Sequence, residues 1–282
     1  MMPRRPSGTG ILPVRIETHR RDARATKNSL FRLSLLLSAL FAVAAMAPPS
    51  QPITLPPEQA AKEGRALVDE MLSQPPDAST TTGVLAIRSK IGYREILVDF
   101  QTTVTSTNWL SDYKAHYSDA TRHILILHTP NHPNTYTQFA SARNEDDEKI
   151  DNRNSAQPVK DIWAPFAGSD FSIADLGLEF LHWPDQKLLQ KEMKRSRSCR
   201  VLESTNPNPA AGGYAKVKSW VDNESHGILL AQAFDAKGNK LKEFAPGDFS
   251  KSKTTGQWQL GKMQISNFQT DSSTTVRFDV DK

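Results

Sequence analysis

Apolar and polar side chains alternate along much of the chain after residue 82, and this pattern restricts it to a largely β fold. Ile96, Val98 and Phe100, for example, would face one side of a strand, while Glu95 and Asp99 would face the other. Alternation of this kind is typical of an antiparallel sheet with one face on the core and one face in water. We therefore expect an antiparallel sheet to form the body of the protein.

Short breaks divide the alternating sequence into twelve candidate segments, which we expect to form about ten strands, accompanied by two or three helices. Asn223-Glu224-Ser225 is the expected turn of one hairpin, and Gly238 lies where a second turn needs a positive φ. The polar segment 144–158 is expected to be a loop or flap, and the basic segment 186–197 to be a helix end or a strand edge. The expected strands cover residues 83–90, 93–104, 107–117, 122–128, 135–142, 199–205, 214–222, 227–235, 241–244, 258–260, 262–268 and 273–280.

An amphipathic helix is expected before the first strand. Thr54 would cap its N-terminus, with prolines in the first turn, and Pro75-Pro76 would end it. Its apolar stripe is narrow, so the helix could lie on or inside a curved sheet. The residues expected on this stripe are Ala60, Ala61, Ala66, Leu67, Met71 and Leu72.

A second helix start is expected in the segment 166–176, near the middle of the chain. Ser172 and Asp175 have the spacing of a capping box, in which each side chain accepts a hydrogen bond from the backbone NH of the other residue. The sequence that follows, 176–184, is more apolar than a solvated helix requires. We expect this stretch to insert a capped helix toward the concave side of the sheet.

The first 47 residues are not expected to belong to the core. Residues 27–47 start basic, continue with an apolar run and end in small residues, which is the order of a cleaved secretory signal peptide. The uncharged run from Leu33 to Met46 is short for a bilayer span, which disfavours the alternative of a membrane anchor. Cleavage is expected near Ala44, Ala45 or Ala47. The arginine-rich residues 1–26 are expected to be a disordered leader or to precede the true translation start, and 48–282 to form one domain.

This leader accounts for the basic balance of the chain. The whole sequence holds 35 Lys and Arg against 31 Asp and Glu, and residues 1–45 contain 8 of the basic and 2 of the acidic residues. The remaining chain is therefore slightly acidic, at about −2, which gives no support to nucleic-acid binding.

The sequence holds no constellation that indicates catalysis or a metal. His123, His128 and His132 are close together, but strand alternation sends His123 and His128 to opposite faces. The spacing of Asp170 and Asp175 is explained by the capping box, and Cys199, the single cysteine, is expected to be a partly buried free thiol. Hydrolase and phosphate-loop motifs do not occur. We therefore expect a protein that is not an enzyme and uses no cofactor.

Three segments of the second half share an order and spacing with a known family. They are Gly168-Ser169-Asp170-Phe171-Ser172-x-x-Asp175-Leu176, then Tyr214-x-Lys216-Val217-x-x-Trp220-Val221-Asp222, then Phe234-Asp235-x-x-Gly238-x-x-Leu241-Lys242. Trp258, Met263 and Asn267, followed by the strand-like run 273–280, continue the pattern. Residues 163–280 thereby resemble the LolA-like periplasmic proteins that sort outer-membrane lipoproteins.

The resemblance implies an α+β, mostly β fold: a strongly curved, incomplete and half-open antiparallel barrel, with helices that plug its concave side. It also implies a periplasmic carrier whose apolar cavity binds lipid or lipoprotein acyl chains for transfer toward the outer membrane. Its partners would be those acyl chains, an inner-membrane donor and an outer-membrane acceptor. The family's lid arginine cannot be matched to a residue of this chain.

Large apolar side chains are the candidate lining of such a cavity, although each could instead fill a solid core. A filled core would favour a second hypothesis, a non-catalytic envelope module that binds a protein partner through its basic strip, Lys187, Lys191 and Lys194. The candidate cavity residues are Trp109, Trp163, Phe166, Phe171, Leu176, Phe180, Trp183 and Trp220.

Overall fold

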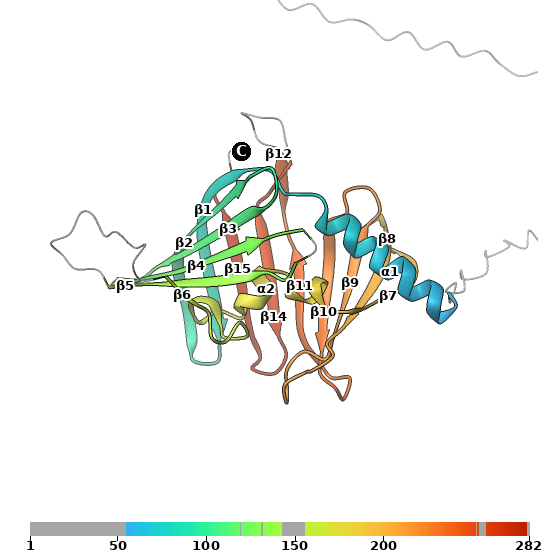
Figure 1. Cartoon of the computed structure of the whole chain (residues 1–282). Helices are drawn as coiled ribbons and strands as arrows, with labels where there is room; N and C mark the ends of the chain where they lie inside the picture. The colour runs from blue at the N-terminus through green and yellow to red at the C-terminus, as the bar shows by residue number, and fades with distance from the viewer. Residues whose placement is uncertain are drawn as a thin grey trace, which may run out of the picture. The chain divides into compact units, whose positions relative to one another are not determined.

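One large antiparallel sheet forms the body of the computed structural model (Figure 1). The structure describes residues 55–118, 120–130, 132–142, 156–251, 253 and 258–280. The interpretations of residues 1–26 and 27–47, and the expected cap at Thr54, lie outside these residues. The sheet has 13 strands in the order β6-β5-β4-β3-β2-β1-β15-β14-β11-β10-β9-β8-β7. It is curved and does not close, as expected of a half-open barrel.

Strand bounds agree closely with the alternation in the sequence, but the strand count is higher than the expected ten. The short strand β6 lies in the expected loop, and the basic segment forms the edge strand β7, because its alternate residues Gln186 and Leu188 are buried. A separate two-stranded sheet contains β12 and β13. The strands are β1 Ser79–Ser89, β2 Gly92–Val104, β3 Trp109–His116, β4 Ala120–His128, β5 Thr135–Ala142, β6 Ala156–Pro158, β7 Asp185–Lys194, β8 Arg197–Thr205, β9 Lys216–Asp222, β10 Ile228–Phe234, β11 Lys240–Pro246, β12 Phe249–Lys251, β13 Trp258–Leu260, β14 Lys262–Asn267 and β15 Ser272–Phe278.

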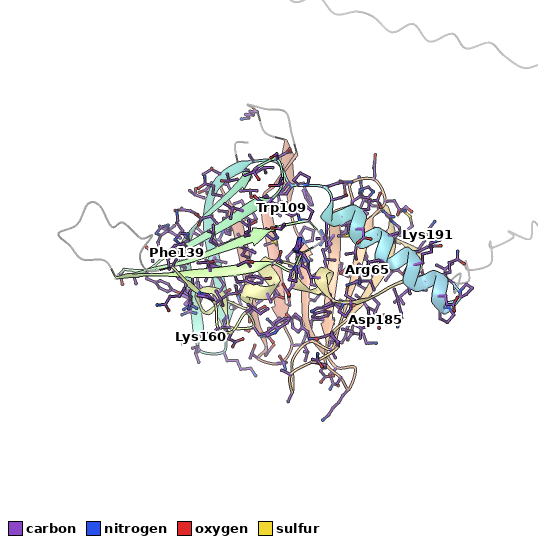
Figure 2. The ribbon with its side chains drawn as sticks, in the orientation of Figure 1. Arg65, Trp109, Phe139, Lys160, Asp185 and Lys191 are labelled. Carbon is purple, nitrogen blue, oxygen red and sulfur yellow. The ribbon has the colours of Figure 1, made fainter. Side chains whose placement is uncertain are left out.

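The first helix, α1 (Pro57–Leu72; Figure 1), packs along β7, and its buried side chains belong to a core cluster with strands β7 to β11. Its N-cap is Pro56, which makes no side-chain hydrogen bond because a proline ring has no polar atom, and Pro57 at the first helical position has no NH to satisfy. Gly64, Leu67 and Val68 are buried against the sheet, whereas Ala66 is exposed, so the expected stripe was wrong at that position. The Arg65 guanidinium reaches from α1 to the Trp183 carbonyl oxygen, 3.0 Å away, near Asp185 at the start of β7 (Figure 2).

Between β6 and β7 the chain crosses the concave face as a helical insert, residues 165–184. The insert contains η2 (Phe166–Gly168), α2 (Ile173–Leu176) and η3 (Glu179–His182). The predicted capping box is confirmed: the Asp175 NH donates to Ser172 Oγ over 3.1 Å, and the Ser172 NH donates to Asp175 Oδ2 over 2.8 Å. The helix that it starts is only four residues long.

The hydrophobic core consists of two clusters that meet beneath the insert. Phe166, Phe171 and Ile173 belong to the first cluster, with side chains from β1 to β5, β14 and β15. Phe180 and Leu181 belong to the second, with side chains from α1 and β7 to β11. The insert therefore packs on both halves of the concave face.

Candidate ligand cavity on the concave face

An apolar cavity of about 340 Å³ lies between the insert and the concave face of the sheet. Its polar rim and its apolar interior come from different levels of the same strands. The lining residues are Ser79, Thr81, Leu85, Phe100, Gln101, Thr102, Ser111, Asp112, Tyr113, Phe166, Phe171, Asp175, Leu176, Leu178, Phe244, Met263, Val276 and Phe278.

Strand register explains this division. Ser79, Thr102 and Ser111 lie directly opposite one another on β1, β2 and β3 and form a row of hydroxyl groups at one end of the cavity. The neighbouring inward row contains Phe100 and Tyr113, whose rings meet edge to face with centroids 5.7 Å apart. Ser79 is exposed, whereas deeper lining residues such as Phe171 are almost fully buried, so the hydroxyl row marks the mouth.

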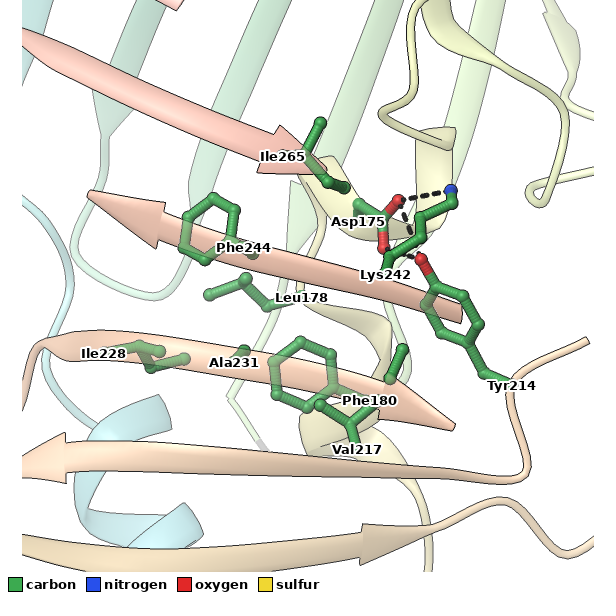
Figure 3. A pocket seen from close by; sticks show the side chains of 11 residues that line it. Asp175, Leu178, Phe180, Tyr214, Val217, Ile228, Ala231, Lys242, Phe244 and Ile265 are labelled. Atoms are coloured by element: carbon green, nitrogen blue, oxygen red, sulfur yellow. Dashed lines mark hydrogen bonds and ion pairs between the residues drawn. The ribbon is translucent and has the colours of Figure 1, made fainter. Parts of the chain in front are cut away.

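A second, much smaller cavity of about 30 Å³ continues beneath η3 (Figure 3). Asp175, Leu178 and Phe244 line both cavities, so the two adjoin at these side chains. The far wall of the small cavity is apolar and comes from η3 and from β9 and β10. Its other lining residues are Phe180, Tyr214, Val217, Ile228, Ala231, Ala233, Lys242 and Ile265.

A group of hydrogen bonds and an ion pair joins the insert to the sheet beside these cavities (Figure 3). The Tyr214 hydroxyl donates to Asp175 Oδ1 over 3.1 Å. Lys242 Nζ lies 3.4 Å from Asp175 Oδ2 and donates to the Asp170 carbonyl oxygen over 2.7 Å. Burial, and after it the Asp175 carboxylate, raise the pKa of Tyr214 well above its usual value. Asp175 is thus held by both a cap and a cation, which is a structural role.

A second group of polar contacts anchors the insert to the β3–β5 side. Asn134 Nδ2 donates to the Gly177 carbonyl oxygen over 2.8 Å, and the Tyr113 hydroxyl donates to the Leu176 carbonyl oxygen over 3.2 Å. The Tyr136 hydroxyl donates to Glu179 Oε2 over 2.7 Å. Burial raises the pKa of Glu179, as it does that of Tyr136. These side chains fix the backbone of the insert where it borders the cavity.

Two of the three histidines considered for a metal site, His123 and His128, lie on opposite faces of the sheet. His128 faces inward, with its ring stacked on Trp109 at 5.0 Å between centroids. His123 faces the other side, where its Nε2 lies 2.8 Å from Asp112 Oδ1 and its ring stacks on Phe139. Within the part of the chain that the structure describes, no group of three or more His, Cys, Asp and Glu side chains is placed to hold a metal ion.

The candidate cavity residues fall into several groups. Phe166, Phe171 and Leu176 line the larger cavity, and Phe180 lines the smaller one. Trp183 is buried in the second core cluster, and Trp163, 37% exposed, packs edge to face on Tyr214. Trp109 packs on His128 instead of lining the cavity.

Trp220 lies on the opposite face of the sheet from the cavity. Its neighbours on β9, Ser219 and Val221, point inward and are fully buried, so the alternation turns Trp220 outward. Its indole NH contacts the Glu192 carboxylate, and Lys194 Nζ lies 4.9 Å from the centroid of its ring. We therefore leave Trp220 out of the candidate site.

Sequence reasoning missed several lining residues. The inward positions of Phe100 and Tyr113 could have been found from the two-residue period of their strands. Phe244 could not, because an extra residue in β11, Leu241, shifts the register of that strand against β10. Leu178 could not, because it follows a break in the insert. Met263 and Phe278 complete the set of missed aromatic and thioether side chains.

A separate hollow, of about 440 Å³, lies near the tip of the β1–β2 hairpin, where the hairpin meets the insert. Arg94 Nη2 in its wall donates to the Gly168 carbonyl oxygen over 2.7 Å. Asp170 accepts hydrogen bonds from Ser272 and Thr274, the latter over 2.8 Å. Because these polar groups are paired with one another, we place the candidate site in the apolar cavity.

Two of the three lysines of the basic strip have local partners, and the cysteine is buried. Lys187 Nζ lies 3.2 Å from the Asp185 carboxylate, and Lys194 lies over Trp220, while Lys191 is exposed. Cys199 is fully buried, and burial raises the pKa of its thiol. The thiol is therefore less acidic than a free cysteine in water.

Comparisons with known proteins identify the fold. A family model described as "Uncharacterized protein" matches residues 155–280, and no curated protein matches the chain. The chain is similar to a crystal structure from Vibrio parahaemolyticus described as an outer membrane lipoprotein-sorting protein domain, with 18% identity, a TM-score of 0.61 and coverage of 78% of this chain and 91% of the other. It is also similar to a DUF1329 family protein from Desulfovibrio piger, with 17% identity, a TM-score of 0.59 and coverage of 78% of this chain and 91% of the other. A LolA superfamily protein from Nitrosomonas europaea has 16% identity and a TM-score of 0.51, with coverage of 78% of this chain and 91% of the other.

These similarities show that the chain has a LolA-like fold, as the sequence resemblance implied. None of the helices in the described residues combines the length and the apolar character that a membrane crossing needs.

Proposed function

We propose that the protein is a periplasmic carrier that shelters acyl chains of a lipid or lipoprotein during transfer toward the outer membrane. It acts by binding alone, without catalysis. The signal-like residues 27–47 support export, and the neighbours of LolA-like fold support a carrier. The observation that carries the proposal is the apolar cavity of about 340 Å³ between insert and sheet.

The physical basis is the transfer of methylene groups out of water. Each buried methylene contributes about 0.8 kcal/mol, so an acyl chain needs an apolar enclosure and few polar contacts. Phe100, Tyr113, Phe171 and Met263 supply such an enclosure, and the hydroxyl row lies at its mouth. This arrangement favours a carrier over the second hypothesis, in which a filled core supports a protein-binding strip.

Filling the cavity tests the proposal. Met263→Trp places a larger side chain on the cavity wall, and Leu97→Trp is the matched control, because Leu97 is 64% exposed on the outer face. We expect the wild type and Leu97→Trp to bind the neutral apolar probe N-phenyl-1-naphthylamine. Exclusion of two or more methylene-sized groups should weaken binding by Met263→Trp about tenfold or more.

Lipid extraction and native mass spectrometry of the purified wild type complete the test. A protein that carries no lipid and does not bind the probe would overturn the carrier proposal, as would equal probe binding by all three proteins.

A further inference from the structure

Leu178 is marked by its backbone conformation. Its φ of 49° and ψ of 43° lie in the left-handed region, which costs free energy in any residue with a β-carbon. Leu178 directly follows α2 and Gly177 and precedes η3. A glycine would relieve this strain, yet the position holds a large aliphatic side chain.

Backbone contacts on both sides hold Leu178 in this conformation. Its NH donates to the Asp175 carbonyl oxygen over 3.2 Å, and its carbonyl oxygen accepts from the Leu181 NH over 2.9 Å. Asn134 fixes the preceding Gly177 carbonyl over 2.8 Å. The direction of the Leu178 side chain is therefore set by the surrounding structure.

This direction places Leu178 at the boundary between the two cavities. Leu178 and Phe244 line both the cavity of about 340 Å³ and the cavity of about 30 Å³ (Figure 3). On the far side, Val217, Ala231 and Ala233 provide an apolar wall with small side chains. An apolar chain that enters at the hydroxyl row would thus meet Leu178 and Phe244 at the inner end of the larger cavity.

The volume of the larger cavity limits how much apolar chain it holds. A methylene group occupies roughly the volume of one water molecule in the liquid, about 30 Å³, so a cavity of about 340 Å³ has room for at least about 11 methylenes. This is enough for one acyl chain of that length. The hydroxyl groups of Ser79, Thr102 and Ser111 at the mouth suit an uncharged, hydrogen-bonding head group.

We propose that the ligand is a one-chain amphiphile with an uncharged polar head, and that Leu178, with Phe244 opposite, sets the longest acyl chain that the cavity shelters. This inference rests on the proposed carrier function and adds its specificity. Leu178 stops the chain at the end of the larger cavity, and its removal joins the two cavities.

A series of saturated monoacylglycerols with 8 to 18 carbons, competing with N-phenyl-1-naphthylamine, tests the proposal. For the wild type, Kd should tighten about fourfold per added methylene and then level off once the cavity is full. In Leu178→Ala the chain length at which Kd levels off should increase by about three carbons, because three side-chain carbons are removed from the end of the cavity. Leu178→Phe should move it to shorter chains, and Phe244→Leu to longer ones.

Leu97→Ala is the matched control, because Leu97 is 64% exposed on the outer face and lines neither cavity. It removes the same three carbons and should neither change the affinity nor move the levelling point. Folding of each variant is checked by circular dichroism. If Leu178→Ala does not fold, Leu178→Phe and Phe244→Leu still test the proposal.

An unmoved levelling point in the folded Leu178 and Phe244 variants would overturn the role of Leu178. Diacylglycerol or an anionic lysophosphatidylglycerol bound as tightly as the best monoacylglycerol would overturn the one-chain, uncharged ligand, while the carrier function would stand. Failure of the wild type to bind any of these lipids or the probe would overturn the carrier function itself.

Discussion

His128 is buried on the concave face, where a charged imidazole would lose its contact with water. Its Nε2 lies 3.2 Å from the Ser111 hydroxyl, and its ring stacks on Trp109. Burial lowers the pKa of His128 to about 4, with nearby His182 acting in the same direction and Asn134 in the other. Burial also lowers the pKa of His182. Both histidines are neutral in the fold near neutral pH.

Stability should therefore fall in acid. His128 takes up a proton below about pH 6.5 in the unfolded chain, but only below about pH 4 in the folded protein. The contribution of neutral His128 to the free energy of unfolding is therefore complete above pH 6.5 and is lost as the pH falls toward 4. The loss is on the order of 3 kcal/mol. Glu179, with a raised pKa, has the opposite sign and offsets part of it. Urea unfolding of the wild type and of His128→Gln between pH 7 and 4 measures the effect.

Between pH 7 and pH 4, the free energy of unfolding should fall less in His128→Gln than in the wild type. The control is His132→Gln, which changes an exposed histidine in the loop after β4 and should leave the profile unchanged. An unchanged acid slope in His128→Gln would contradict this account of the site.

Among the elements, α1 depends on a close approach to the sheet at Gly64. A β-carbon there would lie 2.7 Å from the backbone carbonyl carbon and oxygen of Gln186, which cannot move without shifting β7. Gly64→Ala would gain up to about 1 kcal/mol in helix propensity. We expect the overpacking to exceed this gain and to lower the unfolding free energy by about 1–2 kcal/mol.

Chemical denaturation and hydrogen exchange of α1 amides check this prediction, with Lys62→Ala at an exposed position of the same helix as the control. Equal or greater protection of α1 in Gly64→Ala would show that the helix does not rest on the strand in this way.

The helical elements also show what local sequence can and cannot predict. The start of α2 was predictable, because Ser172 and Asp175 satisfy each other within one turn. Its end after four residues was not, because side chains distant in sequence, Asn134 and Tyr113, hold the insert's carbonyl groups. The left-handed Leu178 follows from these contacts and has no signal in the sequence.

At the scale of the whole molecule, the strands were largely predictable and their order was not. Two-residue alternation located β1 to β5 to within a few residues, because each strand has one buried face. The charged β7 was ambiguous, because its buried Gln186 is polar: its amide donates to the Phe180 and Trp183 carbonyl oxygens. The pairing of β1 with β15, which joins the two ends of the described chain, depends on long-range packing.

That pairing is what creates the candidate site. It brings Leu85 of β1 opposite Val276 of β15, and both then line a cavity closed by an insert from the middle of the chain. The predicted site residues from the insert, Phe166, Phe171 and Leu176, line the cavity, whereas the missed residues, apart from Leu178 of the insert, come from the strands around it. A cavity made from three distant parts of the sequence cannot be assembled from local patterns.

Photo-crosslinking tests the central claim, that an acyl chain lies in this cavity, most directly. A monoacylglycerol with a diazirine at the end of its chain would be irradiated with the protein, and the modified residues located by mass spectrometry of peptides. We predict adducts at Leu178, Phe244 and Met263, which competing unlabelled lipid prevents. Adducts confined to the outer face, at Leu97 or Trp220, would contradict the claim.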